Sequence, residues 1–331
     1  AKNRLKYSKQ GLRQQLMTTV NAVENAYDEL IFARENVKVQ QDALILAQTQ
    51  LDQDQQRVQV GSLAPLDVQQ DEAQVATSQA SLIAAQNTES VDQNTLKALL
   101  TDSYSQWHDQ DIEPTATLTA NLQLFDLQDS WSKGMELRPD LIQATLNVEQ
   151  QGIQLKYSHN QIFPELDLIG SYGFNGASKE YSGTFDQFGQ GNAPYYSYGA
   201  TLSIPLSNAR ARNQYKSDKA TKEQLVLQLK QLEQNIMVAI DNAVKQAQSA
   251  YQSAEATKQA RIYAEAALDA EQKKYAVGKS TTFTVLQLQN NVTSARSQEI
   301  RALANYNEAL ANLALQEGTT LERNKIDLEA K

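Results

Sequence analysis

Few residues of this chain have the types and spacing that chemistry requires. Asp67 and Asp71 stand four residues apart in a segment expected to be helical, so their carboxylates lie one turn apart on one face. Such a pair attracts cations, but acids near a helix start are also favoured by the helix dipole alone. His108 and His159 are isolated in the sequence, which favours surface positions over metal ligation.

The sequence offers no candidate for catalysis. It shows no nucleophile–base pair, no phosphate-cradling glycine loop and no metal-ligand spacing. The 331 residues include no cysteine, which removes disulfides, thiolate metal sites and cysteine nucleophiles. The formal net charge of -9 argues against nucleic acid as a partner. We therefore expect a protein that is not an enzyme and has no cofactor, no metal and no nucleic-acid partner.

An internal repeat organises the elements around these residues. Residues 20–96 recur without a gap 217 positions later, so that Ala22 corresponds to Ala239 and Leu51 to Leu268. Val60-Gly61 corresponds in the same way to Val277-Gly278. A period this long is not that of a solenoid. It predicts two copies of one unit, which consists of a long helix, a glycine turn and a returning helix.

Prolines are absent from 1–64 and from 206–331, which predicts very long helices there. At 1.5 Å per residue, 1–60 gives about 90 Å and 206–276 about 100 Å. Small residues at spacings of three and four allow another helix to approach the second one closely. These residues are Ala239, Ala243, Ala247, Ala250 and Ala254. An ordinary coiled coil is disfavoured because sustained Leu/Ile heptads are missing.

Each long helix is expected to end at a glycine, Gly61 in one copy and Gly278 in the other, because glycine tolerates the left-handed conformation there. Pro65 and Thr281-Thr282 are expected to open the returning helices. Each copy is therefore predicted to be an antiparallel helical hairpin with a tight tip.

Between the copies, residues 164–205 change to a period of two, with apolar and polar side chains alternating over about ten residues on each side of a Gly/Ser/Asn loop. Aromatic residues near the loop close the apolar face. They are Tyr172, Phe174, Tyr196 and Tyr198. The pattern fits a strand pair of a transmembrane barrel with an aromatic girdle, and it also fits a soluble amphipathic hairpin.

The expected fold is thus mainly α, with duplicated very long antiparallel hairpins, a β-ribbon and a small mixed region. The predicted boundaries follow from the changes of pattern. They are 1–100 for the first hairpin, 101–137 for a small mixed connector, 138–163 for a helix, 164–205 for the ribbon, 206–317 for the second hairpin and 318–331 for a C-terminal tail.

Several segments resemble the TolC-like outer-membrane efflux proteins, and the resemblance covers essentially the whole chain. These segments are Arg138-Pro139-Asp140-Leu141, Phe163-Pro164, Leu166-Asp167-Leu168, Val60-Gly61 with Leu66-Asp67-Val68-Gln69, and Tyr275-Ala276-Val277-Gly278 with Phe283-Thr284-Val285-Leu286. The resemblance implies a homotrimeric exit duct in a Gram-negative-type outer membrane. The duct would consist of a transmembrane β-barrel and a long periplasmic α-barrel. An equatorial belt around it would include residues 101–137 and 318–331. Implied partners are outer-membrane lipid, a periplasmic adaptor and an inner-membrane pump. The alternative is a scaffold of helical hairpins without a pore, or the adaptor itself, although an adaptor would carry a lipoyl-like domain that this sequence lacks.

The resemblance also implies a periplasmic gate. Asp67 and Tyr275 match the family's tip acid and tip tyrosine, whereas Ser280 stands where the family has a tip arginine. Thr284 and Gln287 stand where the family has paired aspartates, so an acidic ring from Asp67 with Asp71 is the alternative. The implied adaptor-docking tips are Val60, Gly61, Ser62, Leu63, Val277, Gly278, Lys279 and Ser280.

One departure concerns the start of the sequence. The ribbon and its leading helix, 138–205, have no counterpart before the first hairpin, where the repeat offset would place one upstream of residue 1. The resemblance therefore leads us to expect about eighty further N-terminal residues, with one helix and two strands, in a complete member of the family.

Overall fold

The computed structural model describes residues 2–191 and 193–327. The chain divides into two compact units, a hairpin unit of Arg4–Gln143 and Leu232–Lys331 and a ribbon unit of Ala144–Gln231 with Ala1–Asn3. Of the predicted tail, residues 328–331 lie outside the described part of the chain.

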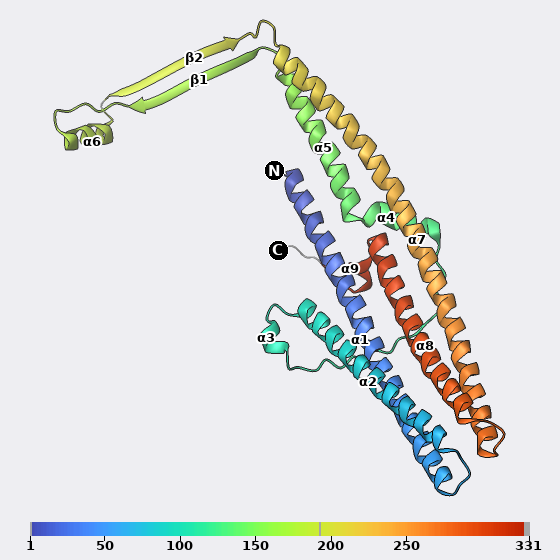
Figure 1. The fold of residues 1–331 in the computed structure, drawn as a ribbon. Coiled ribbons are helices and arrows are strands. Elements are labelled where there is room, and N and C mark those ends of the chain that lie inside the picture. The colour runs from blue at the N-terminus through green and yellow to red at the C-terminus, as the bar shows by residue number, and fades with distance from the viewer. Residues whose placement is uncertain (1, 192, 328–331) are drawn as a thin grey trace. The chain divides into compact units, whose positions relative to one another are not determined.

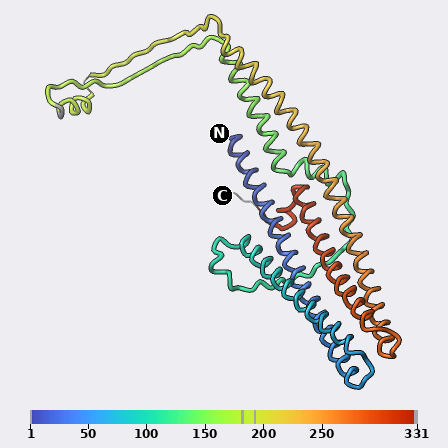
Figure 2. Tube along the Cα trace, in the orientation of Figure 1, coloured from blue at the N-terminus to red at the C-terminus, as the bar shows by residue number. Residues whose placement is uncertain are grey.

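Two antiparallel hairpins of long helices build most of the hairpin unit (Figure 1). The first consists of α1, Lys2–Gln59, and α2, Pro65–Leu100. The second consists of α7, Ala209–Ala276, which contributes to both units, and α8, Thr282–Glu317. The proline-free stretches of the sequence are therefore long helices, as predicted, and the tube in Figure 2 shows the two tips at the same end of this unit.

Glycine ends both long helices in the same way. Gly61 has a φ of 75° and Gly278 a φ of 73°, a left-handed conformation that glycine adopts without a Cβ clash. After α1, Ser62 N donates to Arg57 O at 2.9 Å, and after α7, Lys279 N donates to Lys274 O at 2.9 Å. These bonds satisfy carbonyls that the helix ends leave free, so both tips are tight.

Small side chains allow α7 and α8 to pack closely. Ala247 and Ala250 of α7 are buried against Tyr306 and Ala309 of α8. The ring of Tyr306 is 1% exposed, and its hydroxyl donates to Asn121 O in the connector. The alanine series found in the sequence is thus a helix-packing seam, and burial of its neighbours stabilises helices that propensity alone would leave marginal.

The connector between α2 and α5 contains two helices. These are α3, Tyr104–Trp107, and α4, Leu127–Leu137, while the alternating stretch 115–120 lies in an irregular segment. Asp126 caps α4 by accepting from Gln128 N at 2.9 Å. A short helix, α9, Thr320–Arg323, follows α8.

Arg138, in the Arg-Pro-Asp-Leu segment, joins the start of α5, Pro139–Asn160, to the end of α8. Its guanidinium donates to Gln316 O at 3.1 Å and binds the Asp140 carboxylate at 2.6 Å. Gly318, at the end of α8, has a φ of 80°, and a Cβ there would lie 3.0 Å from Leu137 C. The segment thus has a packing role that explains its residue types.

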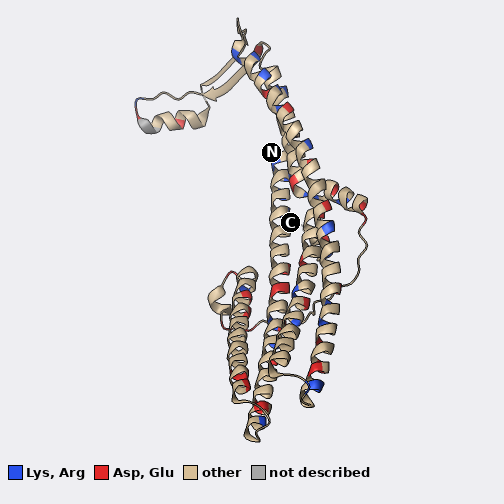
Figure 3. Cartoon of the chain, turned by 45° about the vertical axis from the view of Figure 1, so that its right-hand side comes forward, with Lys and Arg blue, Asp and Glu red and all other residues tan. Residues whose placement is uncertain are grey.

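The ribbon unit contains one antiparallel pair, β1, Glu165–Phe174, and β2, Pro194–Ser203. Leu166 pairs with Leu202 and Tyr172 with Tyr196, so the predicted apolar residues share one face, while Ser171 pairs with Ser197 on the other. A helix that the sequence did not suggest, α6, Tyr181–Gln190, lies between the strands. On the strands, charge is confined to Glu165 and Asp167 at the start of β1, and Figure 3 shows that most charged residues lie on helices.

Candidate functional site at the helical tips

The two tips present exposed apolar side chains. Val60 is 79% exposed and Val277 is 68% exposed, one in each Val-Gly pair. Phe283, just after the second tip, is 65% exposed. Ser280 does not point freely into water, because its hydroxyl donates to Glu271 Oε1 at 2.6 Å. The left-handed conformation of the glycines accounts for the tight shape of the tips. It does not explain why exposed apolar residues stand beside the glycines.

Just above the tips, a buried polar cluster joins the two hairpins. Asp54 of α1 is 0% exposed, and its Oδ2 accepts from Tyr275 OH at 2.7 Å and from Thr282 Oγ1 at 3.3 Å. Gln50 Nε2, one turn earlier in α1, donates to the same oxygen at 2.8 Å. Tyr275 ends α7 and Thr282 starts α8, so this cluster is a direct link between the hairpins. We call Gln50, Asp54, Asp71, Tyr275 and Thr282 the clasp.

Asp71 is the second buried acid of the clasp. Its carboxyl is 0% exposed and lies within hydrogen-bonding reach of Asp54. Burial first, and then the nearby charge of Asp54, raise the pKa of Asp71 to about 7. The sequence grouped Asp71 with Asp67 on a solvated face. In the structure Asp67 is half-buried, whereas Asp71 is turned into the helix packing.

Tyr275 remains a hydroxyl donor over the whole physiological range. Burial first, and then its bond to Asp54, raise its pKa to about 12 despite its contact with Thr282. The Arg57 guanidinium stacks over its ring at 4.4 Å, with Nη1 3.5 Å from Asp54 Oδ1. This partly exposed cation therefore pairs with Asp54, one of the two buried acids of the clasp.

The other residues predicted for the gate are not part of the clasp. Thr284 is half-buried and bonds the cap residue Thr281, whose Oγ1 accepts from Thr284 N at 3.3 Å. Gln287 is exposed and lines a shallow groove between α2 and α8 with Gln70 and Phe283. The gate role of Asp67, Asp71, Tyr275, Ser280, Thr284 and Gln287 stays a prediction.

Sequence reasoning missed Asp54, Gln50 and Thr282. The spacing of Gln50, Asp54 and Arg57 places all three on one face of α1, and this pattern could have indicated a polar contact there. Asp52 is equally acidic and lies on the exposed side, so composition alone did not separate the two.

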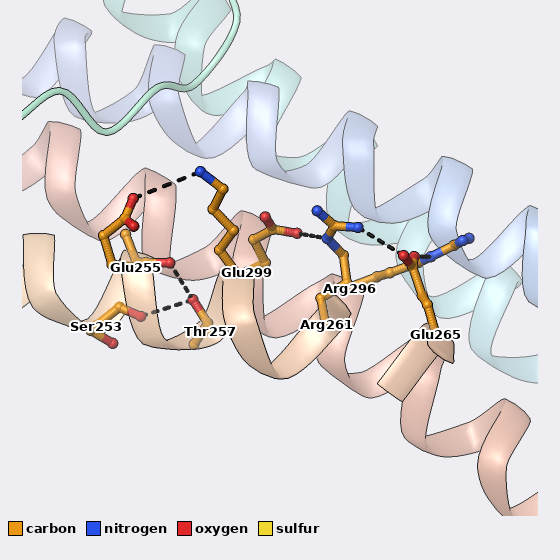
Figure 4. Close-up of polar contacts among 9 residues, drawn as sticks. Ser253, Glu255, Thr257, Arg261, Glu265, Arg296 and Glu299 are labelled. Atoms are coloured by element: carbon orange, nitrogen blue, oxygen red, sulfur yellow. Dashed lines mark hydrogen bonds and ion pairs between the residues drawn. The ribbon is translucent and has the colours of Figure 1, made fainter. Parts of the chain in front are cut away.

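Farther from the tips, ion pairs join α7 to α8 within the second hairpin (Figure 4). Glu265 of α7 accepts from Arg296 of α8 at 2.8 Å, and Arg261 binds both Glu265 and Glu299. Arg296 also reaches Asp42 of α1 at 3.6 Å. These groups are partly exposed, so each pair adds little stability, but together they fix which helix faces interlock.

Neither histidine belongs to such a cluster. His108 is an exposed neighbour of Asp109, and the exposed His159 packs against the rings of Phe163 and Tyr215. Within the described ranges, no group of three or more His, Cys, Asp or Glu residues is placed to hold a metal ion.

Paired long hairpins, glycine tips and a strand ribbon in one chain define the class of outer-membrane efflux proteins. The chain matches the sequence model described as outer membrane efflux protein over residues 1–101 and 132–319, and it belongs to that family. It is 25% identical over 322 residues to the outer membrane protein TolC of Salmonella enteritidis, and equally identical over 313 residues to TolC of Escherichia coli. These matches cover 95% and 92% of this chain, but the chain spans only 63% and 61% of those relatives.

Solved structures show the same fold. A membrane protein from Pseudomonas aeruginosa superposes with a TM-score of 0.81 at 20% identity, covering 96% of this chain and 70% of that one. The Campylobacter jejuni CmeC outer membrane channel gives a TM-score of 0.80 at 16% identity, covering 100% and 71%. The family and these relatives place the protein in the outer membrane of a Gram-negative bacterium. Among the residues that the structure describes, no helix combines the length and apolar character needed to cross a bilayer.

Proposed function

We propose that this protein is the exit duct of a tripartite efflux or type I secretion system, a passive conduit that opens at its periplasmic tips. The observation that carries the proposal is the ribbon. One face of β1–β2 is apolar and exposed along its length, with Leu168 81% and Tyr198 89% exposed, in a chain whose remaining mass is long helical hairpins. Lipid is the partner that such a face fits.

A homotrimer with a threefold axis is the proposed assembly. Apolar side chains remain exposed along the hairpin shafts, including Ile45 at 54%, Ile83 at 56% and Val91 at 53%. Neighbouring chains would cover them, and the duplication would give the ring of helices a pseudo-sixfold arrangement. Light scattering of the full-length protein in detergent should give the mass of three chains, and a monomer alone would contradict the assembly.

The proposed partners are a periplasmic adaptor and, through it, an inner-membrane pump. The exposed Val60 and Val277 offer the adaptor apolar contacts at the tips, and the polar Ser62 and Lys279 lie beside them.

Planar-bilayer recording of the full-length protein tests the proposal. Reconstituted trimers should conduct ions in discrete steps, because a duct is a continuous aqueous path. A helical scaffold or an adaptor without a pore would insert no conducting units at matched protein density. A variant with charges on the apolar ribbon face is the matched negative control.

A further inference from the structure

The clasp contains two buried acids, and the neighbouring cation can neutralise only one of them. Asp54 and Asp71 are both 0% exposed, and among the described residues the cation paired with either acid is Arg57, whose Nη1 lies 3.5 Å from Asp54 Oδ1. Two ionised carboxylates side by side in a dry helix interface would repel each other strongly and would lose their hydration. The pair therefore needs one additional positive charge.

The hydrogen bonds indicate where that charge sits. Asp54 Oδ2 already accepts from Gln50, Tyr275 and Thr282. Neither oxygen of Asp71 has a donor among the described residues. Because Asp71 lies within hydrogen-bonding reach of Asp54, a bond between the two carboxyls requires a hydrogen on one of them. Asp71 is the member that has no other donor to satisfy it.

We propose that Asp71 carries a proton that it shares with Asp54, and that this shared proton holds the α1–α2 hairpin closed against the α7–α8 tip. Loss of the proton leaves two buried carboxylates in contact, and their repulsion separates the hairpins at the clasp. The claim about proton sharing concerns one chain, and only its consequence for opening a channel rests on the proposed function.

The charged and titratable groups around the pair come from three helices. Asp54 and Arg57 belong to α1, Asp67 and Asp71 to α2, and Tyr275 to α7. The fourth helix, α8, contributes the uncharged Thr282. Tyr275 keeps its hydrogen because its pKa is about 12, so it titrates far above the range in question.

The direction of the pH dependence follows from these neighbours. The pKa of Asp71 is raised from 3.8 to about 7 by burial, then by Asp54 and to a smaller extent by Asp67. The closed clasp binds more protons than the open one between these two values, so a rise in pH through that window weakens it. The shared proton stabilises the closed clasp fully below pH 3.8, and this stabilisation is lost as the pH passes about 7.

Spin labels at Ser62→Cys and Lys279→Cys in the full-length protein would report the separation of the tips. These positions flank the clasp without belonging to it, and this sequence has no cysteine that would compete for the label. Distances measured by pulsed electron resonance should be short and narrow at pH 5 and longer or broader at pH 8.5. The midpoint of this change in distance should lie near pH 7, because the pKa of Asp71 is about 7.

Asp71→Asn is the decisive variant, because its amide supplies the donor permanently at nearly the same volume. We expect short tip distances at both pH values and loss of the pH response. Asp67→Asn is the matched control on the same helix and should keep the response with a midpoint shifted to lower pH. A pH response that persists in Asp71→Asn, or a wild-type distance that is the same at both pH values, would overturn the proposal.

Two further measurements identify the charge itself. The infrared carbonyl bands of protonated carboxyls at pH 5 should lose one component in Asp71→Asn, whether or not the protein conducts, while Asp28 and Glu308, whose pKa values are raised to about 6 and about 7, supply bands that remain. Calcium or magnesium added at pH 8.5 should leave the tips apart. Closure by either ion would show that a metal, rather than a proton, occupies the pair and would reject the assignment.

Discussion

At the scale of single residues, the tip chemistry depends on which face of each helix is buried. Asp67, Asp71 and Tyr275 were identified as tip residues from the sequence. That Asp71 faces Asp54 rather than water follows from how α2 packs on α1, which no spacing within α2 reveals. The same packing buries Asp54 and leaves Asp52 exposed, although the two acids stand only two positions apart in α1.

The burial of Asp71 changes what the charge at the gate is expected to be. In the proposed trimer, the half-buried Asp67 is the acid that would remain to face a water-filled constriction, and three copies would attract cations. Asp67→Asn should therefore lower the cation selectivity of the full-length channel, measured as a reversal potential under a salt gradient.

Thr284→Ala and Gln287→Ala are the comparisons for that measurement and should change the potential little, because neither residue is charged. An unaltered reversal potential in Asp67→Asn would leave Asp67 as an acid favoured by the start of α2 alone.

Tyr275→Phe tests the clasp through stability. The change removes the bonds of 2.7 Å to Asp54 and 2.8 Å to Thr282, and it leaves a buried carboxylate with fewer donors. We expect a loss of about 1–3 kcal/mol, seen as a lower thermal midpoint by circular dichroism. Tyr263→Phe, at a side chain that is 70% exposed on the same helix, should change almost nothing. Equal midpoints for the two variants would contradict the importance of these bonds.

At the scale of elements, the long helices were predictable and the short ones were not. Glycine marks the C-terminal ends of α1, α7 and α8, and Pro65 marks the start of α2, since both residue types act through the local backbone. The residues of α6 contain three aromatic side chains among glycines and polar residues, a mixture that also suits a loop. Its helical state is therefore not encoded in a clear period of the sequence.

Glycines that end helices should differ in their tolerance of alanine. At Gly61 an added Cβ meets nothing within 4 Å, so Gly61→Ala costs only the left-handed strain, about 1–2 kcal/mol. At Gly318 the same Cβ would also lie 3.0 Å from Leu137 C and 3.1 Å from Arg138 N, which are backbone atoms. Gly318→Ala should lower the thermal midpoint further than Gly61→Ala. The reverse order would show that the junction at Arg138 relaxes freely.

At the scale of the whole molecule, the ribbon shows most clearly what the sequence pattern predicts and what it leaves open. The period-two pattern correctly assigned residues to faces, as the pairing of Leu168 with Ala200 and of Ile169 with Gly199 shows. The pattern did not decide between lipid and water as the surroundings, because exposed apolar residues look alike in either case. Membership of the outer-membrane efflux protein family is what favours lipid in the proposal above.

Leu168→Arg and Ile169→Arg therefore form a matched pair of variants on opposite faces of one strand. Arginine on a lipid-facing position costs about 2–4 kcal/mol near the middle of the bilayer, whereas the opposite face tolerates charge. The amount of trimer recovered in the outer-membrane fraction should fall for Leu168→Arg and stay near wild type for Ile169→Arg. Equal recovery of both would show that this face does not meet lipid.

The clasp also shows how far the two copies of the repeat have drifted apart. At the repeat offset, Asp54 corresponds to Glu271, Asp71 to Leu288 and Tyr275 to Val58, so neither copy alone has both halves of the link. In the proposed trimer, seams within a chain would carry an acid–tyrosine bond that seams between chains lack. A ring that looks nearly sixfold would then behave as a threefold one, in which the joints inside each chain respond to pH and the joints between chains do not.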